Sequence, residues 1–96
     1  MIASFGNALT EDLYRGRTST RTRKVPPDVI ERTLRKLSMI DAAHDFADLE
    51  VPPGNRLEKL RGNHAGWWSI RDNDQWRIIF RWVEGTAHEV TFCDYH

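Results

Sequence analysis

The most restrictive feature of this 96-residue sequence is an alternation of apolar and basic side chains in segment 76–82. Every second position is apolar: Trp76, Ile78, Phe80 and Trp82. Arg77 and Arg81 fall between them. Successive side chains of a strand point to opposite faces of a sheet. The pattern therefore predicts a half-buried β-strand with one apolar face and one face that carries arginines.

Turn residues flank this strand on both sides. Asp-Asn-Asp at 72–74 precedes it and Glu-Gly-Thr at 84–86 follows it, and apolar segments lie beyond both turns. This arrangement is typical of three antiparallel strands joined as a meander. The short apolar segment 1–5 is consistent with a further strand at the edge of the same sheet.

The first half of the chain has helical patterns. Asn7 or Thr10 can cap a short helix that Gly16 ends. A longer helix is expected from the Pro-Pro-Asp start at 26–28 to about Ala43, with one more turn at 45–49 and a stop at Pro-Pro-Gly 52–54. We therefore expect one α+β domain spanning 1–96, with an antiparallel sheet of about four strands and two N-terminal helices packed on one face.

Composition narrows the class of protein. The sequence contains no apolar run long enough for a transmembrane helix, and segment 1–5 lacks the features of a signal peptide. A single cysteine, Cys93, cannot form an internal disulfide and is expected to be a small buried residue. These features favour a cytoplasmic protein with no membrane partner.

The net charge of zero conceals segregated charges. Five basic residues occur within ten positions, with no acidic residue among them: Arg15, Arg17, Arg21, Arg23 and Lys24. We expect this segment to be a mobile loop. A solvated loop is the simplest interpretation, and a contact with nucleic acid or the ribosome is the alternative.

A second set of polar residues lies in the strand-rich half. Lys59, Arg61, Arg77 and Arg81 could bind phosphates and stabilise the charge on a phosphorane, or they could be ordinary solvated residues. The chain closes on Asp94, Tyr95 and His96. A histidine can transfer protons near neutral pH and an aspartate can orient it, although a frayed chain end is the alternative.

Strict alternation places Asp94 and His96 on the opposite face from Tyr95, so the three share one cleft only if the strand ends, twists or bulges there. No other class of site is indicated. His44, His64 and His88 are scattered, so we expect no metal site, and no glycine-rich phosphate loop is present. We expect no cofactor.

Four stretches of the second half form a specific ordered pattern. They are Arg-Leu-Glu-Lys-Leu-Arg-Gly at 56–62, Gly-Trp-Trp-Ser-Ile-Arg at 66–71, Asn-Asp-Gln-Trp-Arg-Ile at 73–78 and the terminal Asp-Tyr-His at 94–96. In order and spacing this pattern resembles HigB-type toxins, the plasmid maintenance system killer proteins of the RelE/ParE superfamily. The similarity covers nearly the whole chain.

The resemblance implies a RelE-like microbial RNase fold and a ribosome-dependent endoribonuclease that cuts mRNA in the A site. It also implies a HigA-type helix-turn-helix antitoxin that neutralises the toxin and binds operator DNA with it. By position, Asp94, Tyr95 and His96 match the terminal catalytic motif. Arg77 matches the strand arginine, and Lys59 and Arg61 fall in the basic segment.

One position departs from some relatives, which carry a catalytic histidine where this chain has Glu58. A carboxylate can act as a base, but it cannot mimic an imidazolium at neutral pH. Two alternatives stay open: a ParE-like toxin that inhibits DNA gyrase and cuts nothing, and a non-enzymatic module that binds RNA or the ribosome.

Overall fold

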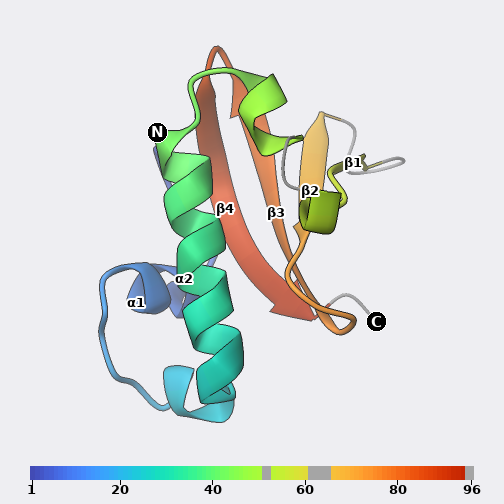
Figure 1. Ribbon diagram of the computed structural model, residues 1–96. Helices are drawn as coiled ribbons and strands as arrows, with labels where there is room; N and C mark the ends of the chain where they lie inside the picture. Colours follow the sequence, from blue (N-terminus) through green and yellow to red (C-terminus); the bar gives the residue numbers. More distant parts are fainter. Residues whose placement is uncertain (51–52, 61–65, 95–96) are drawn as a thin grey trace.

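The computed structural model describes residues 1–50, 53–60 and 66–94. It confirms the α+β class, with two helices packed against a four-stranded antiparallel sheet (Figure 1). The helices are α1 (Ala8–Tyr14) and α2 (Pro27–Ala42). The strands pair in chain order and are β1 (Glu58–Lys59), β2 (Trp67–Arg71), β3 (Trp76–Val83) and β4 (Thr86–Asp94).

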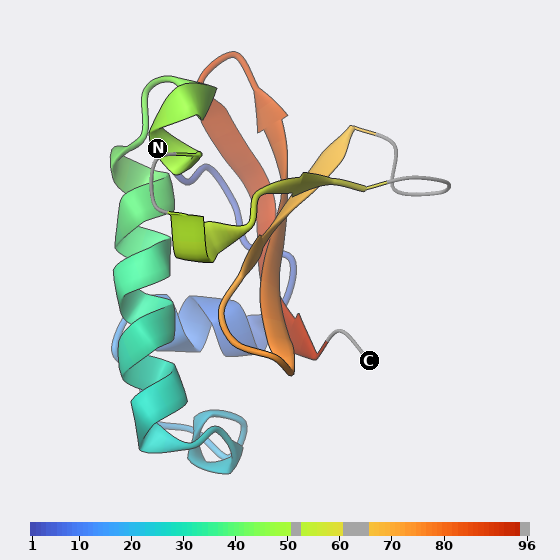
Figure 2. The same ribbon diagram turned by 45° about the vertical axis from the view of Figure 1, so that its right-hand side comes forward.

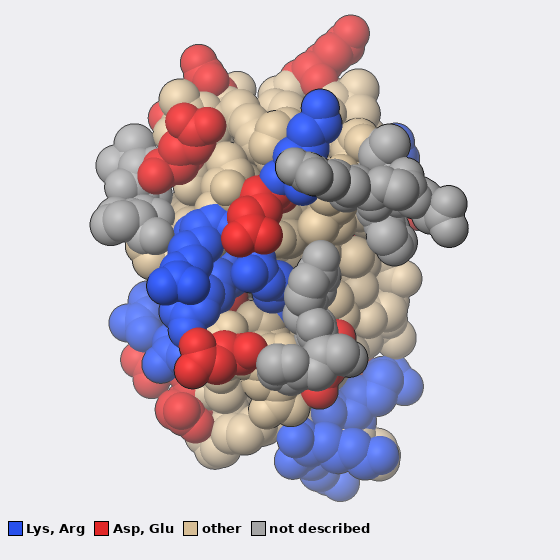
Figure 3. Space-filling view, turned by 90° about the vertical axis from the view of Figure 1, so that its right-hand side faces the viewer, with Lys and Arg blue, Asp and Glu red and all other residues tan. Residues whose placement is uncertain are grey.

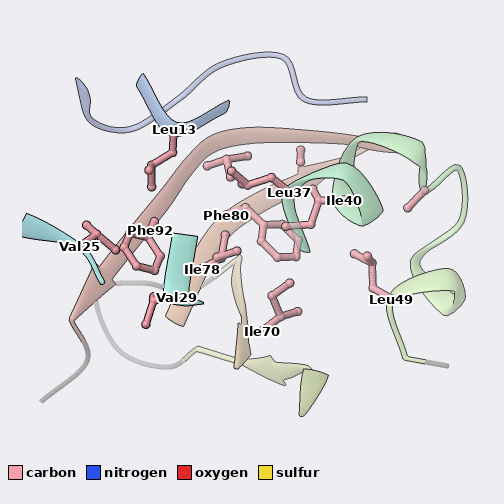
Figure 4. Close-up of a cluster of buried hydrophobic side chains, with 13 residues drawn as sticks. Leu13, Val25, Val29, Leu37, Ile40, Leu49, Ile70, Ile78, Phe80 and Phe92 are labelled. Carbon is pink, nitrogen blue, oxygen red and sulfur yellow. The ribbon is translucent and has the colours of Figure 1, made fainter. Parts of the chain in front are cut away.

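The alternation in β3 has the predicted consequence. Ile78 and Phe80 are fully buried, whereas Arg77 and Arg81 lie on the other face of the strand. Both helices lie on the apolar side, and Figure 2 shows α2 running along it. Leu37 and Ile40 of α2 are fully buried in the same core, which Figure 4 shows between the helix and the strands. No helix of the described residues lies on the opposite side of the sheet, and we call that side the open face.

Local signals placed both helices correctly. The Asn7 side chain caps α1 by accepting a hydrogen bond from the backbone N–H of Thr10 at 3.0 Å. Gly16 follows the helix with φ 71°, the left-handed conformation that glycine adopts without strain. Proline at the first position starts α2, and the helix ends at Ala42, one residue before the expected end.

The identity of the fourth strand differs from the prediction. Segment 1–5 forms only two isolated parallel bridges to β4, Ile2 with Ala87 and Phe5 with Val90. The β4 backbone between these bridges is irregular, because Glu89 has φ 53° and the β3–β4 register shifts there. This bulge interrupts the ladder that segment 1–5 could extend. The two-residue β1 instead completes the sheet.

The described residues also form three short 3₁₀ helices between the longer elements: η1 (Thr22–Lys24), η2 (Phe46–Leu49) and η3 (Pro53–Asn55). The turn predicted at 45–49 is confirmed as η2. The prediction that Pro-Pro-Gly 52–54 ends all helical structure was wrong for η3, where the buried Asn55 amide donates to the Leu49 carbonyl at 3.1 Å. Pro52 lies outside the described residues. No helix in the described segments has the length and apolar character needed to cross a membrane.

Candidate functional site

Arg77 is the centre of the candidate site on the open face. Its side chain is only 17% exposed, and its Nη1 donates a hydrogen bond to the Ser69 hydroxyl at 2.9 Å. Its Nη2 lies 3.7 Å from a carboxylate oxygen of Glu58. Ser69 is fully buried, whereas the Glu58 side chain is 57% exposed. A guanidinium that donates to a buried hydroxyl and faces an exposed carboxylate is oriented, and that carboxylate can give way to another anion.

Strand register explains this arrangement. Glu58 of β1 pairs with Ser69 of β2, and Arg71 of β2 pairs with Arg77 of β3. Paired residues of antiparallel strands share a face, and side chains two positions along are diagonal neighbours. The sheet therefore brings Glu58, Ser69, Arg71 and Arg77 together. Figure 3 looks at the side of the molecule that carries β1 and β2, and it shows acidic and basic side chains in contact near the centre.

Asp94 lies at the end of β4, opposite Trp76 in the register. It is exposed, and its Oδ2 accepts a hydrogen bond from the Gln75 side-chain amide at 3.1 Å. The residue before it, Cys93, is the cross-strand partner of Arg77. Asp94 is thus one position from the residue opposite Arg77, on the alternate face of the strand. Tyr95, His96 and Arg61 lie outside the described residues.

Cys93 is half-buried, so the expectation of a buried cysteine was only partly met. Burial raises the pKa of its thiol, and the negative charge of Asp94 raises that pKa further, although Arg77 opposes both effects. The thiol is therefore protonated at neutral pH, since a cysteine normally ionises above it. A protonated thiol is a poor nucleophile, which agrees with the absence of a role for Cys93 in the sequence interpretation.

Two other predicted phosphate-binding residues lie apart from the Glu58–Arg77 pair. Lys59 pairs with Trp68 in the register, and its Nζ lies 6.0 Å from the centre of the Trp68 ring. It therefore occupies the alternate face of β1 from Glu58. Arg81 shares the open face with Arg77, but its Nε is 2.7 Å from a carboxylate oxygen of Glu89. An exposed ion pair of this kind leaves the cation available at a small cost.

The basic segment 15–24 lies beside α1 and the start of α2, away from β1 in both ribbon views (Figures 1 and 2). Arg17 and Arg21 both lie near the buried Asp12 carboxylate, at 3.9 and 3.1 Å. The expected loop ends in the η1 turn, because Ser19 and Thr22 exchange hydrogen bonds. Arg23 and Lys24 are exposed within that turn. The segment is a basic surface separate from Arg77.

Sequence reasoning missed Ser69, whose hydroxyl fixes Arg77. A serine within a strand carries no signal of its own, because its partner depends on register. The signal that could have found it is the alternation of β2, which places Ser69 and Arg71 on one face. Among the histidine, cysteine and acidic side chains of the described residues, no group of three or more could hold a metal ion.

Comparison with known proteins gives the family. Residues 3–96 match the family described as RelE-like toxin of type II toxin-antitoxin system HigB. Toxin HigB-1 of Vibrio cholerae is 43% identical over 96 residues, covering 100% of this chain and 98% of that protein. Endoribonuclease HigB of Proteus vulgaris is 33% identical over 75 residues, covering 78% of this chain and 80% of that protein.

A solved structure titled as the YoeB-YefM complex from Staphylococcus aureus shares the fold. It has a TM-score of 0.63 and 17% identity, and the match covers 100% of this chain and 98% of that chain. A YoeB/ParE toxin from Agrobacterium tumefaciens has a TM-score of 0.55 and 19% identity, with 97% and 96% of the two chains covered. The fold, with two helices on a four-stranded sheet and an arginine fixed on the open face, agrees with the family match over residues 3–96. This chain therefore belongs to the HigB family of RelE-like toxins of type II toxin–antitoxin systems.

Proposed function

We propose that this chain is an endoribonuclease that cleaves mRNA on the ribosome and so arrests translation and growth. Membership of the HigB toxin family supports this activity, as does the name of its Proteus vulgaris relative, Endoribonuclease HigB. The structural observation that carries the proposal is Arg77, which is held on a central strand by a buried hydroxyl. A fixed cation can stabilise charge that develops on a phosphate without reorganising during the reaction.

In the proposed reaction the ribose 2′ oxygen attacks the adjacent phosphorus. The bond from phosphorus to the 5′ oxygen then breaks, which leaves a 2′,3′-cyclic phosphate and a 5′ hydroxyl. His96 or Glu58 takes the 2′ proton, the departing 5′ oxygen takes a proton from water, and Asp94 orients His96. Because the nucleophile belongs to the substrate, positioning and charge stabilisation supply most of the catalysis, and the mechanism uses no metal.

The remaining residues bind the substrate in this proposal. Arg77 and Arg61 stabilise the phosphorane, Lys59 and Arg81 contact the RNA backbone, and Tyr95 stacks on a base or donates a hydrogen bond. Arg15, Arg17, Arg21, Arg23 and Lys24 form a separate basic surface that contacts ribosomal RNA.

The Glu58–Arg77 contact supports a role for Glu58 near the reacting phosphate. Its carboxylate lies 3.7 Å from the guanidinium and is more than half exposed. A phosphate bound by Arg77 would therefore have a carboxylate beside it that can accept a proton. A general base must lie within reach of the proton that it removes, and its pKa becomes relevant only when that condition is met.

We also propose that an antitoxin neutralises the chain. The family is defined by toxin–antitoxin systems, and solved structures with the same fold are titled as complexes of YoeB with YefM. A HigA-type helix-turn-helix antitoxin that also binds operator DNA is the specific form of this proposal.

Substitution of the proposed acid–base group tests the nuclease. The His96→Ala variant should lose cleavage by about 10²- to 10⁴-fold, the usual contribution of such a group. Primer extension on translated mRNA after induction measures this directly. His44→Ala is the matched control, since His44 is exposed in the segment before η2. Full cleavage by the His96→Ala variant would refute the assignment.

The same experiment separates the two alternatives. A gyrase inhibitor would induce DNA-damage signalling, leave mRNA intact and tolerate substitutions at Asp94 and His96. The activity of a non-enzymatic ribosome-binding module would be unchanged by His96→Ala but lost when the basic segment 15–24 is neutralised. Site-specific cuts that require His96 exclude both.

A further inference from the structure

Arg71 of β2 and Arg77 of β3 form a like-charge pair on the open face. They are direct cross-strand partners in the register, so their Cβ atoms are about 4.5–5.5 Å apart. Like charges placed opposite each other in a sheet destabilise it. Among the described residues, β2 has no strand partner on its outer side at Arg71, since β1 pairs with Trp68 and Ser69, and Arg71 instead forms an ion pair with Asp74 of the following turn. The pair therefore calls for a functional explanation.

The two guanidinium groups lean in opposite directions along the sheet, each toward its own carboxylate. Arg77 points to Ser69 and to Glu58 of β1, whereas Arg71 points to Asp74 in the β2–β3 turn. Both carboxylates are accessible, with the Glu58 side chain 57% exposed and the Asp74 side chain 95% exposed. The arginines are more protected, at 17% and 29%. Each cation thus has a fixed position and an anion that solvent can replace.

We propose that Arg71 is a second phosphate-binding residue, which binds the RNA phosphate next to the one that Arg77 contacts. On binding, backbone phosphates replace the carboxylates of Asp74 and Glu58 as partners of the two arginines. The like-charge repulsion in the free protein is then relieved by the substrate. This inference rests on the proposed function, because it takes RNA as the ligand of Arg77.

The geometry favours a chain of phosphates over a single small anion. Because the two side chains lean apart, one phosphate cannot engage both guanidinium groups in the orientations that Glu58 and Asp74 hold. Two linked phosphates on one RNA strand can engage both guanidinium groups, since each phosphate presents its own charge to one arginine. Arg32 of α2 adds a further cation beyond this end of β2, with its Nη1 3.4 Å from the Asp72 carbonyl oxygen.

The test measures binding without cleavage. A short single-stranded RNA with 2′-O-methyl groups cannot undergo 2′ attack, and fluorescence anisotropy gives its affinity at several salt concentrations. Loss of one charge-assisted contact in Arg71→Ala should weaken binding about tenfold. It should also reduce the slope of log affinity against log salt by about 0.7, the value for one phosphate on single-stranded RNA.

Three matched variants complete the design. Arg35→Ala removes the same charge from the exposed side of α2 and should bind as the unmodified chain does. Arg71→Lys retains the cation and should keep the salt slope, so the slope reports the charge at position 71. Asp74→Asn removes the competing carboxylate and should strengthen binding about two- to fivefold. The turn survives this change, because Asn73 accepts the backbone N–H groups of Gln75 and Trp76.

The outcomes distinguish this inference from the proposed function. Equal affinities and slopes for Arg71→Ala and Arg35→Ala overturn the second phosphate site, whether or not the chain cleaves mRNA. Weaker binding by Asp74→Asn also overturns it, because the carboxylate would then be assisting the ligand. A chain that binds RNA through Arg71 yet makes no cuts in translated mRNA supports the site and refutes the nuclease.

Discussion

The contact between Thr33 of α2 and Asp72 at the end of β2 should contribute substantially to stability. Thr33 is fully buried and Asp72 is 4% exposed. The Thr33 hydroxyl donates to Asp72 Oδ2, and no hydrogen bond in the described structure reaches Oδ1 of the same carboxyl group. This carboxyl group therefore depends on one hydroxyl for its direct side-chain hydrogen bonding. We expect Thr33→Val, which keeps the side-chain shape, to be clearly destabilising.

The magnitude follows from the burial. Removing one partner of a hydrogen bond to a charged buried group costs about 1.5–3 kcal/mol, because the group left behind keeps its desolvation penalty. We therefore expect Thr33→Val to lower the free energy of unfolding by about 2 kcal/mol. For a chain of this length that loss corresponds to a fall in Tm of roughly 10 °C.

Urea denaturation and calorimetry at neutral pH provide the assay, in a His96→Ala background so that toxicity does not limit expression. Thr33→Ser is the matched control. It retains the hydroxyl and loses one methyl group, which costs about 1 kcal/mol. If Thr33→Val has the stability of the unmodified chain, or if the two variants are equally destabilised, the hydroxyl does not support Asp72 and the reasoning fails.

Three further predictions concern titration and close packing. Burial raises the pKa of Asp72. The free energy of unfolding should therefore fall as the pH rises from 3.8 through the folded-state pKa. In urea titrations at several pH values, Asp72→Asn should remove that fall. The pKa of Asp12 is lowered, chiefly by its hydrogen bond with Ser19. The ionised carboxylate therefore adds to the free energy of unfolding above pH 3.8, and this stabilisation is lost as the pH falls through the folded-state pKa. Asp12→Asn should remove this acid-dependent loss and increase hydrogen exchange in segment 15–24. Gly6→Ala should destabilise by about 1–3 kcal/mol, because its Cβ would overlap the Thr91 hydroxyl, and Gly6→Ala with Thr91→Ala should recover part of the loss in the same assay.

Elements with strong local signals were predictable from the sequence. The alternation in β3, the proline start of α2 and the Asn7 cap each depend on residues within a few positions, and each was confirmed. The bulge at Glu89 was not predictable, because it depends on how β4 fits between β3 and segment 1–5. It explains why segment 1–5 does not form the predicted edge strand.

Contacts between distant residues limited the prediction of the site. Arg77 was expected to bind phosphate from the strand alternation and the family resemblance, yet its partners Ser69 and Glu58 depend on two strand registers. Thr33 and Asp72 are 39 residues apart, and no spacing rule connects them. A buried polar pair of this kind is visible only when the helix and the sheet are packed together.

Arg77 and Arg81 are equivalent in the sequence, as two arginines four residues apart on one strand, but the bulge makes them different. It lies between them in the β3–β4 register and places Glu89 beside Arg81 at 2.7 Å. Arg77 lies where the register is regular, and its carboxylate partner comes from β1 at 3.7 Å. The Arg81–Glu89 ion pair is therefore closer than the Arg77–Glu58 ion pair, and a phosphate should replace Glu58 more easily than Glu89. This difference favours Arg77 over Arg81 in the proposed binding of the scissile phosphate, and the proposed second site at Arg71 lies on the side of Arg77 away from the bulge.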